Sequence, residues 1–321
     1  MKGKSRSQGS KGGMPVARWY CTLLLITAVM TYLLITAGGI VCVTGGSTGC
    51  PDWPGCYGQP VPPMRMDSII EYSHRVVAAV TSLLIVATAA VSLWRYRSIR
   101  WLSRPPALAI VFLIAVTIFG ALVVLQGLPP GLAATDLGSA LLVLALIAMP
   151  TVIAFARQAN PSLPDLLIFR SAFSRLTLAV LVAVFIVLVS GTLVARSGSL
   201  VRCLGWPLYG ATLDLAELHG WLQAARLLFA TGTGILLIAV VVQAWRLQPR
   251  RGAIRRAATM VGLLFLGEIL TGTLISAFGH SILLLVIQVA LAAALWAMLV
   301  ILAVLAGLPS ATTEEAYRAR L

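Results

Sequence analysis

Hydrophobic residues fall in long runs along this chain, and short polar stretches that carry most of the charge separate the runs. Each run holds about 20 residues or more, the length that an α-helix needs to cross the hydrocarbon core of a bilayer. Backbone polar groups in lipid must be satisfied within their own segment, so each run is predicted to be a transmembrane helix. The expected spans are residues 19–42, 68–93, 105–126, 133–156, 175–194, 213–242, 258–278 and 281–306.

The composition supports a membrane protein. Of the 321 residues, 59% are hydrophobic and only 11% are charged, whereas a typical soluble domain is roughly 25% charged. So few charges cannot cover a water-facing surface, which excludes a soluble enzyme, a disordered chain and a small secreted disulfide-rich fold. We expect an all-α, multi-pass protein of the bacterial cell membrane, surrounded by lipid.

The positions of the basic residues matter more than the net charge of +14. Most of them lie in the two tails and in the loops that follow every second run, which all face the same side of the membrane. The opposite side carries only Arg65, Arg196 and Arg202. Because cytoplasmic loops are enriched in Lys and Arg, both termini are predicted to be cytoplasmic. The basic charge then reflects topology, and we expect no nucleic-acid partner.

The two long outer loops indicate an internal duplication. Cys, Trp and Pro occur at the same offsets in Cys50-Pro51-Asp52-Trp53-Pro54 and in Cys203-Leu204-Gly205-Trp206-Pro207. Each loop precedes a run with a His near its outer end, His74 in the first case and His219 in the second. The expected organisation is a disordered basic cytoplasmic tail (1–18), an N-terminal four-helix half (19–156), a cytoplasmic linker (157–174), a C-terminal four-helix half (175–306) and a cytoplasmic tail (307–321).

The cysteines fit this topology. Cys50 and Cys56 face the oxidising side, where a disulfide persists, although a reduced pair or a metal-ligating pair stays open on the residues alone. Cys21 and Cys42 lie at the ends of the first run and are expected to be small packing residues. Cys203 is expected to be a free thiol.

Ionisable residues at membrane depth are costly and are functional-site candidates by default. Glu71 and His74 are three residues apart, which places them on one face of a helix. Arg226 follows His219 by seven residues and shares its face. Other candidates are Asp136, Asp214, Glu217 and Glu268.

A His on a membrane helix can be a metal or heme ligand, a proton-relay group or a structural residue. Two His at equivalent positions of a duplicated unit favour ligation, because imidazole is a good axial ligand for heme iron and helix bundles commonly hold such cofactors. His280 lies in a short outer loop and is interpreted as an interfacial residue.

These motifs together resemble those of the bacterial heme A synthase family, from about residue 20 to residue 306. The resemblance rests on the outer loops, on His219 and on the motifs Gly39-Ile40-Val41, Thr44-Gly45 and Glu71-Tyr72-Ser73-His74-Arg75. It implies a membrane oxidoreductase that oxidises a methyl group of heme O to a formyl group, giving heme A for cytochrome oxidase. It also implies a heme O supplier, protoheme farnesyltransferase, as a partner, and a homo-oligomer is a further option.

The resemblance implies b-type heme in the second half and the substrate or product porphyrin in the first. His74 and His219 would be axial ligands and Glu71 the catalytic residue. Cys50 and Cys56 would form a disulfide. Two further positions are implied to support the site or a heme propionate, Arg75 and Arg226.

Two positions depart from the family pattern. Asp136 and Gln288 stand where the family has two further His ligands. Neither side chain replaces imidazole well on low-spin iron, so a heme-binding or heme-handling membrane protein without catalysis, acting in oxidase assembly, is the alternative to the enzyme.

Overall fold

The computed structural model describes residues 15–59, 61–126, 129–194, 218–248, 251–279 and 281–309. Within these residues the chain forms eight helices that are long and apolar enough to cross a membrane, together with one short 3-10 turn, and no β-strand. The all-α prediction is confirmed. The helices are α1 (Arg18–Val43), α2 (Met66–Arg95), α3 (Arg100–Leu125), α4 (Pro130–Ala159), α5 (Ala172–Val194), α6 (Leu218–Leu247), α7 (Gly252–Phe278) and α8 (Ile282–Gly307), and the turn η1 spans Gly46–Thr48.

Several helices extend beyond the apolar runs that predicted them. The clearest case is α3, which begins at Arg100 and carries Pro105 and Pro106 inside it. The carboxylate of Asp165 accepts hydrogen bonds from the backbone N–H groups of Arg100 (2.5 Å) and Trp101 (3.2 Å). A helix N-terminus has unpaired N–H groups, so this distant cap supports a first turn that hydropathy alone does not show.

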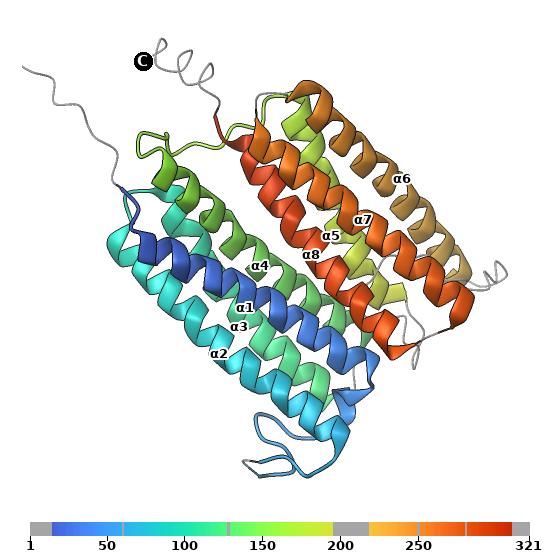
Figure 1. Ribbon diagram of the computed structural model, residues 1–321. Helices are drawn as coiled ribbons and strands as arrows, with labels where there is room; N and C mark the ends of the chain where they lie inside the picture. The colour runs from blue at the N-terminus through green and yellow to red at the C-terminus, as the bar shows by residue number, and fades with distance from the viewer. Residues whose placement is uncertain are drawn as a thin grey trace, which may run out of the picture.

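The helices lie side by side in two groups, α1–α4 and α5–α8 (Figure 1). Helices α1 and α4 of the first group pack on α8 of the second, and α4 also packs on α5. The indole N–H of Trp296 on α8 donates to the Leu141 carbonyl of α4 (2.8 Å). The two groups are therefore joined by a packed interface built around α8.

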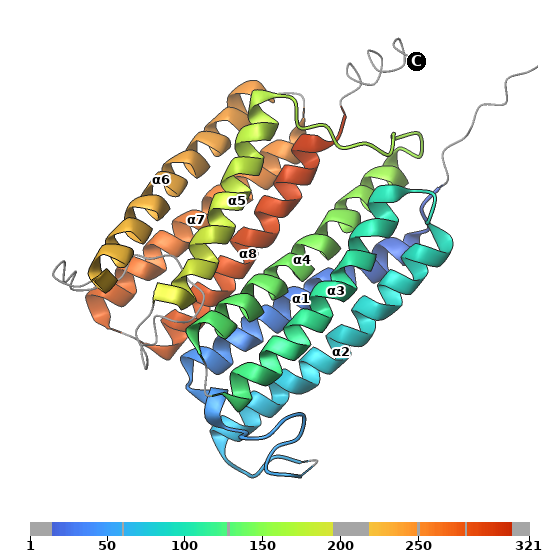
Figure 2. The same ribbon diagram turned by 180° about the vertical axis from the view of Figure 1, so that it is seen from behind.

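Both ends of the described chain lie at one end of the bundle, and the α1–α2 loop lies at the other (Figure 2). Helix α4 continues to Ala159 and α5 starts at Ala172, so the connection between the groups is shorter than the expected linker. Its Ile168 N–H donates to the Gly307 carbonyl at the end of α8 (2.7 Å). We call the end that carries the α1–α2 loop the loop end, and the opposite one the terminal end.

Among the described residues, the arginines that the sequence analysis assigned to one side of the membrane cluster at the terminal end. They lie near the start of the odd-numbered helices, near the end of the even-numbered ones, or in the connections between them. Examples are Arg18, Arg95, Arg100, Arg157 and Arg246.

Candidate functional site

A disulfide between Cys50 and Cys56, whose Cα atoms are 4.7 Å apart, cross-links the α1–α2 loop. We call this loop, residues 44–65, the disulfide loop. Both cysteines are fully buried. The predicted pairing is confirmed, and the reduced and metal-ligating alternatives are set aside. Cys42 is also disulfide-bonded, so its interpretation as a packing residue was wrong, whereas Cys21 is free and buried as expected.

Asp52 organises the backbone inside the disulfide loop. Its carboxylate accepts hydrogen bonds from the backbone N–H groups of Gly58 and Tyr57, both at 2.6 Å. These two bonds, the Gly58 one foremost, hold the pKa of the Asp52 carboxyl below its usual range. Tyr57 and Gly58 both have positive φ angles, 56° and 66°, and the carboxylate stabilises this strained turn.

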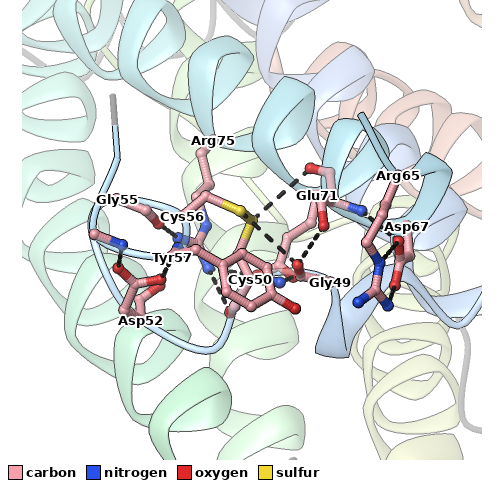
Figure 3. The surroundings of a disulfide bond; sticks show 12 residues. Gly49, Cys50, Asp52, Gly55, Cys56, Tyr57, Arg65, Asp67, Glu71 and Arg75 are labelled. Atoms are coloured by element: carbon pink, nitrogen blue, oxygen red, sulfur yellow. Dashed lines mark hydrogen bonds and ion pairs between the residues drawn. A yellow bond between two sulfur atoms is a disulfide. The ribbon is translucent and has the colours of Figure 1, made fainter. Parts of the chain in front are cut away.

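The loop is seated on a polar stripe of α2 formed by Ser68, Glu71 and Arg75. Figure 3 shows Glu71 and Arg75 directed toward the loop. The Ser68 hydroxyl donates to the Gly49 carbonyl (2.6 Å), and the Cys50 N–H donates to Oε2 of Glu71 (2.8 Å). The spacing of three and then four residues places all three side chains on one face of the helix. The start of α2 and the loop therefore form one hydrogen-bonded unit.

Arg75 is the most extensively bonded member of the polar stripe. Its guanidinium donates to Oε1 of Glu71 at 2.5 Å. It also donates to the backbone carbonyls of Asp52 (2.7 Å), Cys50 (3.3 Å) and Gly55. Of the two roles expected for Arg75, this geometry favours site support.

His74 lies beside the polar stripe, on the side of α2 that faces α1. Its ring is partly buried. A Cβ atom added at Gly38 of α1 would be only 3.2 Å from Nε2 of His74. The absence of a side chain at position 38 therefore lets the His74 ring pack close to the backbone of α1.

Asp136 occupies the corresponding depth on α4. It is the seventh residue of that helix and His74 is the ninth of α2, which at 1.5 Å per residue places both about 9–12 Å from the loop end of their helices. Oδ1 of Asp136 is buried, faces Gly120 of α3, and has no hydrogen-bond partner among the described residues. The first group of helices thus presents an imidazole and an unsatisfied carboxyl oxygen at one depth.

In the second group, Gln288 of α8 is 1% exposed and Glu268 of α7 is fully buried. The Gln288 side-chain amide approaches Oε2 of Glu268 at 3.5 Å. The position that the family pattern gives to a His is therefore occupied by an amide that already contacts a carboxyl group.

Arg226 of α6 reaches across to α5. It donates to the Ser190 hydroxyl and to the Val187 carbonyl, both at 3.2 Å. A Cβ atom at Gly191 would be 2.8 Å from the guanidinium, so that glycine permits the approach. The side chain of His219 lies outside the described residues, as do His280, Cys203, Asp214 and Glu217.

The structure brings Cys50, Cys56, Glu71 and Arg75 together, and it pairs Gln288 with Glu268. Ser68 was missed by the sequence analysis. Its spacing from Glu71 and Arg75 could have revealed it. Three polar residues on one face of an apolar helix need polar partners, which predicts a segment that packs on that face.

The chain has clear relatives among known proteins. A family model for cytochrome oxidase assembly proteins matches residues 21–69 and 66–300. The heme A synthase of Alkalihalophilus pseudofirmus is 26% identical over 255 residues, covering 77% of this chain and 84% of that protein. The heme A synthase of Geobacillus kaustophilus is 28% identical over 264 residues, covering 80% and 81%.

A third relative, the heme A synthase of Bacillus licheniformis, is 28% identical over 233 residues, covering 69% of this chain and 74% of that protein. The family match spans well over half of the chain and includes both the disulfide loop and the helix that carries His74. With eight helices able to span a bilayer, the chain is a multi-pass bacterial membrane protein that belongs to the cytochrome oxidase assembly protein family.

Proposed function

We propose that this chain is a heme A synthase, a membrane oxidoreductase that oxidises a methyl group of heme O to a formyl group and so supplies heme A to cytochrome oxidase. The observation that carries the proposal is the family match across residues 21–300, together with curated relatives that are heme A synthases. The disulfide loop, Glu71 and Arg75 form one hydrogen-bonded unit. His74, which belongs to the same motif, lies beside it.

The first half has residues that fit a heme O or heme A group. His74 would hold it through the imidazole, whose Nε2 lies beside Gly38, a position of α1 without a side chain. The unsatisfied Oδ1 of Asp136 offers a hydrogen-bond acceptor at the same depth. When bound, the heme supplies the redox chemistry that oxidation of a methyl group requires.

Glu71 is the proposed catalytic carboxylate of this half. Its Oε1 and Oε2 atoms accept bonds from Arg75 and from the Cys50 N–H. Each oxygen keeps a second lone pair at which a proton can be taken up. The bond from the Cys50 N–H ties the position of this carboxylate to that of the loop.

The second half would hold b-type heme through His219 of α6. Gln288 is a poor substitute for a second imidazole, and its amide is already in contact with Glu268. These residues fit a heme held by one protein imidazole. Arg226 bonds to groups of α5, which supports a role in holding the walls of this half.

We propose the domain organisation and topology expected from the sequence. The halves are residues 19–156 and 175–306, and the tails 1–18 and 307–321 are cytoplasmic. The linker expected over 157–174 is reduced to residues 160–171, because α4 ends at Ala159 and α5 begins at Ala172. Clustering of arginines at the terminal end supports this orientation through the positive-inside rule. The loop end, with Glu71 and His74, would then face the outside.

Pigment analysis tests the function. The chain is co-expressed with protoheme farnesyltransferase, the proposed heme O supplier, in cells that lack their own heme A synthase. We expect extracted heme A, and we expect His74→Ala to abolish it while the protein still accumulates in the membrane. The proposal is rejected if the parent chain is abundant and inserted in the membrane, yet converts no heme O. Size-exclusion chromatography of the same preparation tests the proposed homo-oligomer.

A heme-binding or heme-handling protein without catalysis is the second candidate. The substitution of Asp136 and Gln288 for two family ligands favours it. This candidate expects heme b to co-purify with the chain and heme O to pass unchanged through the co-expressing cells.

A further inference from the structure

We propose that Arg75 is a positioning residue that, with Ser68 and Glu71, locks the disulfide loop onto α2 beside His74. The inference rests on the proposed function only in that His74 is taken to hold the porphyrin. It assigns to the polar stripe a task that differs from proton transfer and from contact with a heme propionate.

The side chains of the lock and the proposed ligand point in neighbouring directions around α2. At about 100° per residue, Ser68, Glu71 and Arg75 fall within a sector of roughly 60°, and His74 lies about 60° beyond Glu71 and about 100° from Arg75. The loop therefore sits on the sector of Ser68, Glu71 and Arg75, and the His74 ring, next to that sector, faces Gly38 of α1. The seat of the loop thus borders the surroundings of His74.

The donor pattern of Arg75 requires a guanidinium. Loop carbonyls of Cys50, Asp52 and Gly55 and a carboxylate oxygen of Glu71 all accept from this one side chain. A planar guanidinium presents five N–H donors in a fixed fork, whereas a lysine presents one compact ammonium group. A lysine at position 75 would keep the positive charge but could not make most of these hydrogen bonds to the loop.

Glu71 acts as the bridge between the two partners. One carboxylate oxygen accepts from Arg75 and the other from the Cys50 N–H. Its side chain is only 4% exposed and that of Arg75 is 13% exposed. Loss of either group leaves the other buried without its charge partner, so the two should behave as one unit.

Ser68 and Gly49 complete the seat of the loop. The Ser68 hydroxyl donates to the Gly49 carbonyl, and a Cβ atom at Gly49 would be 2.5 Å from the backbone of Asp67. No gap separates the loop from the first turn of α2. Because Cys50 and Cys56 are fully buried there, an external thiol can attack the disulfide only after the loop lifts.

The test uses reduction of the Cys50–Cys56 bond as a reporter of loop lifting. The purified full-length chain is incubated with dithiothreitol, and the new thiols are alkylated and quantified on the peptide that contains both cysteines. We expect Arg75→Lys and Ser68→Ala each to raise the reduction rate about tenfold or more. Arg65→Lys is the matched control, because the exposed Arg65 side chain pairs with the half-buried carboxylate of Asp67. This variant should leave the rate within twofold of the parent.

Heme A yield supplies the second readout. Positioning predicts that Ser68→Ala, which removes no ionisable group, lowers heme A yield in step with the faster reduction. Because Glu71 is also the proposed catalytic carboxylate, its coupling to Arg75 is measured by the reduction rate. Arg75→Lys combined with Glu71→Gln should be reduced no faster than the faster single variant, since both changes break one unit. Equal reduction rates in Arg75→Lys and the parent would overturn the lock, and a loosened loop with full heme A yield would overturn the positioning role.

The two proposals fail in different ways. A parent chain that makes no heme A, yet shows slow reduction that Arg75→Lys and Ser68→Ala accelerate, rejects the enzyme and supports the lock. If the parent chain makes heme A and every variant is reduced at the same rate as the parent, the lock is rejected and the enzyme proposal stands.

Discussion

At the scale of single residues, the site consists of polar groups whose hydrogen bonds lie almost entirely within the protein. Glu71 accepts from a guanidinium and a backbone amide, and Gln288 contacts a buried carboxyl group. A buried polar atom left without a partner costs about 1–3 kcal/mol. The unsatisfied Oδ1 of Asp136 is therefore conspicuous, and it marks the place where the first half would gain most from a bound group.

Gln288→His tests the second half at this scale. The new imidazole would stand on α8 where the family has a ligand, with Glu268 beside it to orient the ring. We expect the heme of the purified protein to shift from high spin toward low spin, as seen in its absorption and electron paramagnetic resonance spectra. Gln288→Leu is the control and should leave the spin state unchanged; an unaltered spectrum in the His variant would count against heme binding at this position.

The turn held by Asp52 should weaken in acid. Its pKa is lowered in the folded loop, mainly by the Gly58 N–H, so its stabilising effect is complete above the ordinary aspartate value of about 3.9 and is lost as the pH falls through the lower folded value. Amide exchange at Tyr57 and Gly58 should therefore rise, relative to distant amides, as the pH falls below about 4. In Asp52→Asn, which has no carboxyl group to titrate, this acid-dependent step should disappear; its persistence there would assign it to another group.

At the scale of helices, the sequence predicted the features that the thickness of the bilayer determines. All eight spans follow from run length, because a lipid-facing helix must be apolar over a fixed thickness. Helix ends and loop seating could not be predicted in the same way. The cap on α3 comes from Asp165, 65 residues along the chain, and Ser68 reads as an ordinary polar residue until the loop folds back on it. Cys50 and Cys56 could be recognised as a pair from the sequence. The hydrogen bonds of Arg75 could not, because their acceptors are backbone carbonyls whose positions depend on how the loop folds.

The distant cap of α3 gives a prediction for that helix. Asp165→Ala removes the acceptor for the N–H groups of Arg100 and Trp101, and loss of an N-terminal cap costs typically ~1 kcal/mol. We expect a lower thermal midpoint and faster amide exchange confined to the first turn of α3. Ser162→Ala in the same connection is the comparison. Uniform exchange changes along all helices would show that the residue acts more broadly than as a cap.

At the scale of the whole molecule, α8 is the element that both groups share. It packs on α1, α4, α5 and α7, and 61% of its most apolar window is buried, against 28% for α1 and α2. The joint between α1 and α8 is close at Gly39, where an added Cβ atom would be 2.1 Å from a methyl carbon of Val289. The two halves are thus held together by backbone-to-side-chain contact that tolerates no extra volume.

Gly39→Ala should weaken the packing of α1 on α8. Overpacking of a tight contact costs typically ~1–3 kcal/mol, so we expect a lower thermal midpoint in detergent. Adding Val289→Ala removes the methyl groups that clash and should restore much of the loss. Gly232→Ala, at a helical glycine with open space around it, should have little effect. A double variant as unstable as Gly39→Ala alone would refute the role of this contact.

The position of α8 also bears on how the protein is made. A ribosome makes α8 after the other seven described helices, yet α8 supplies the Trp296 bond to α4 and the Gly307 carbonyl that receives the α4–α5 connection. Until α8 enters the membrane, α1 and α4 lack this partner, and surrounding lipid must cover Gly39. The first group of helices can pack within itself beforehand, whereas most of the interface between the two groups forms only when α8 inserts.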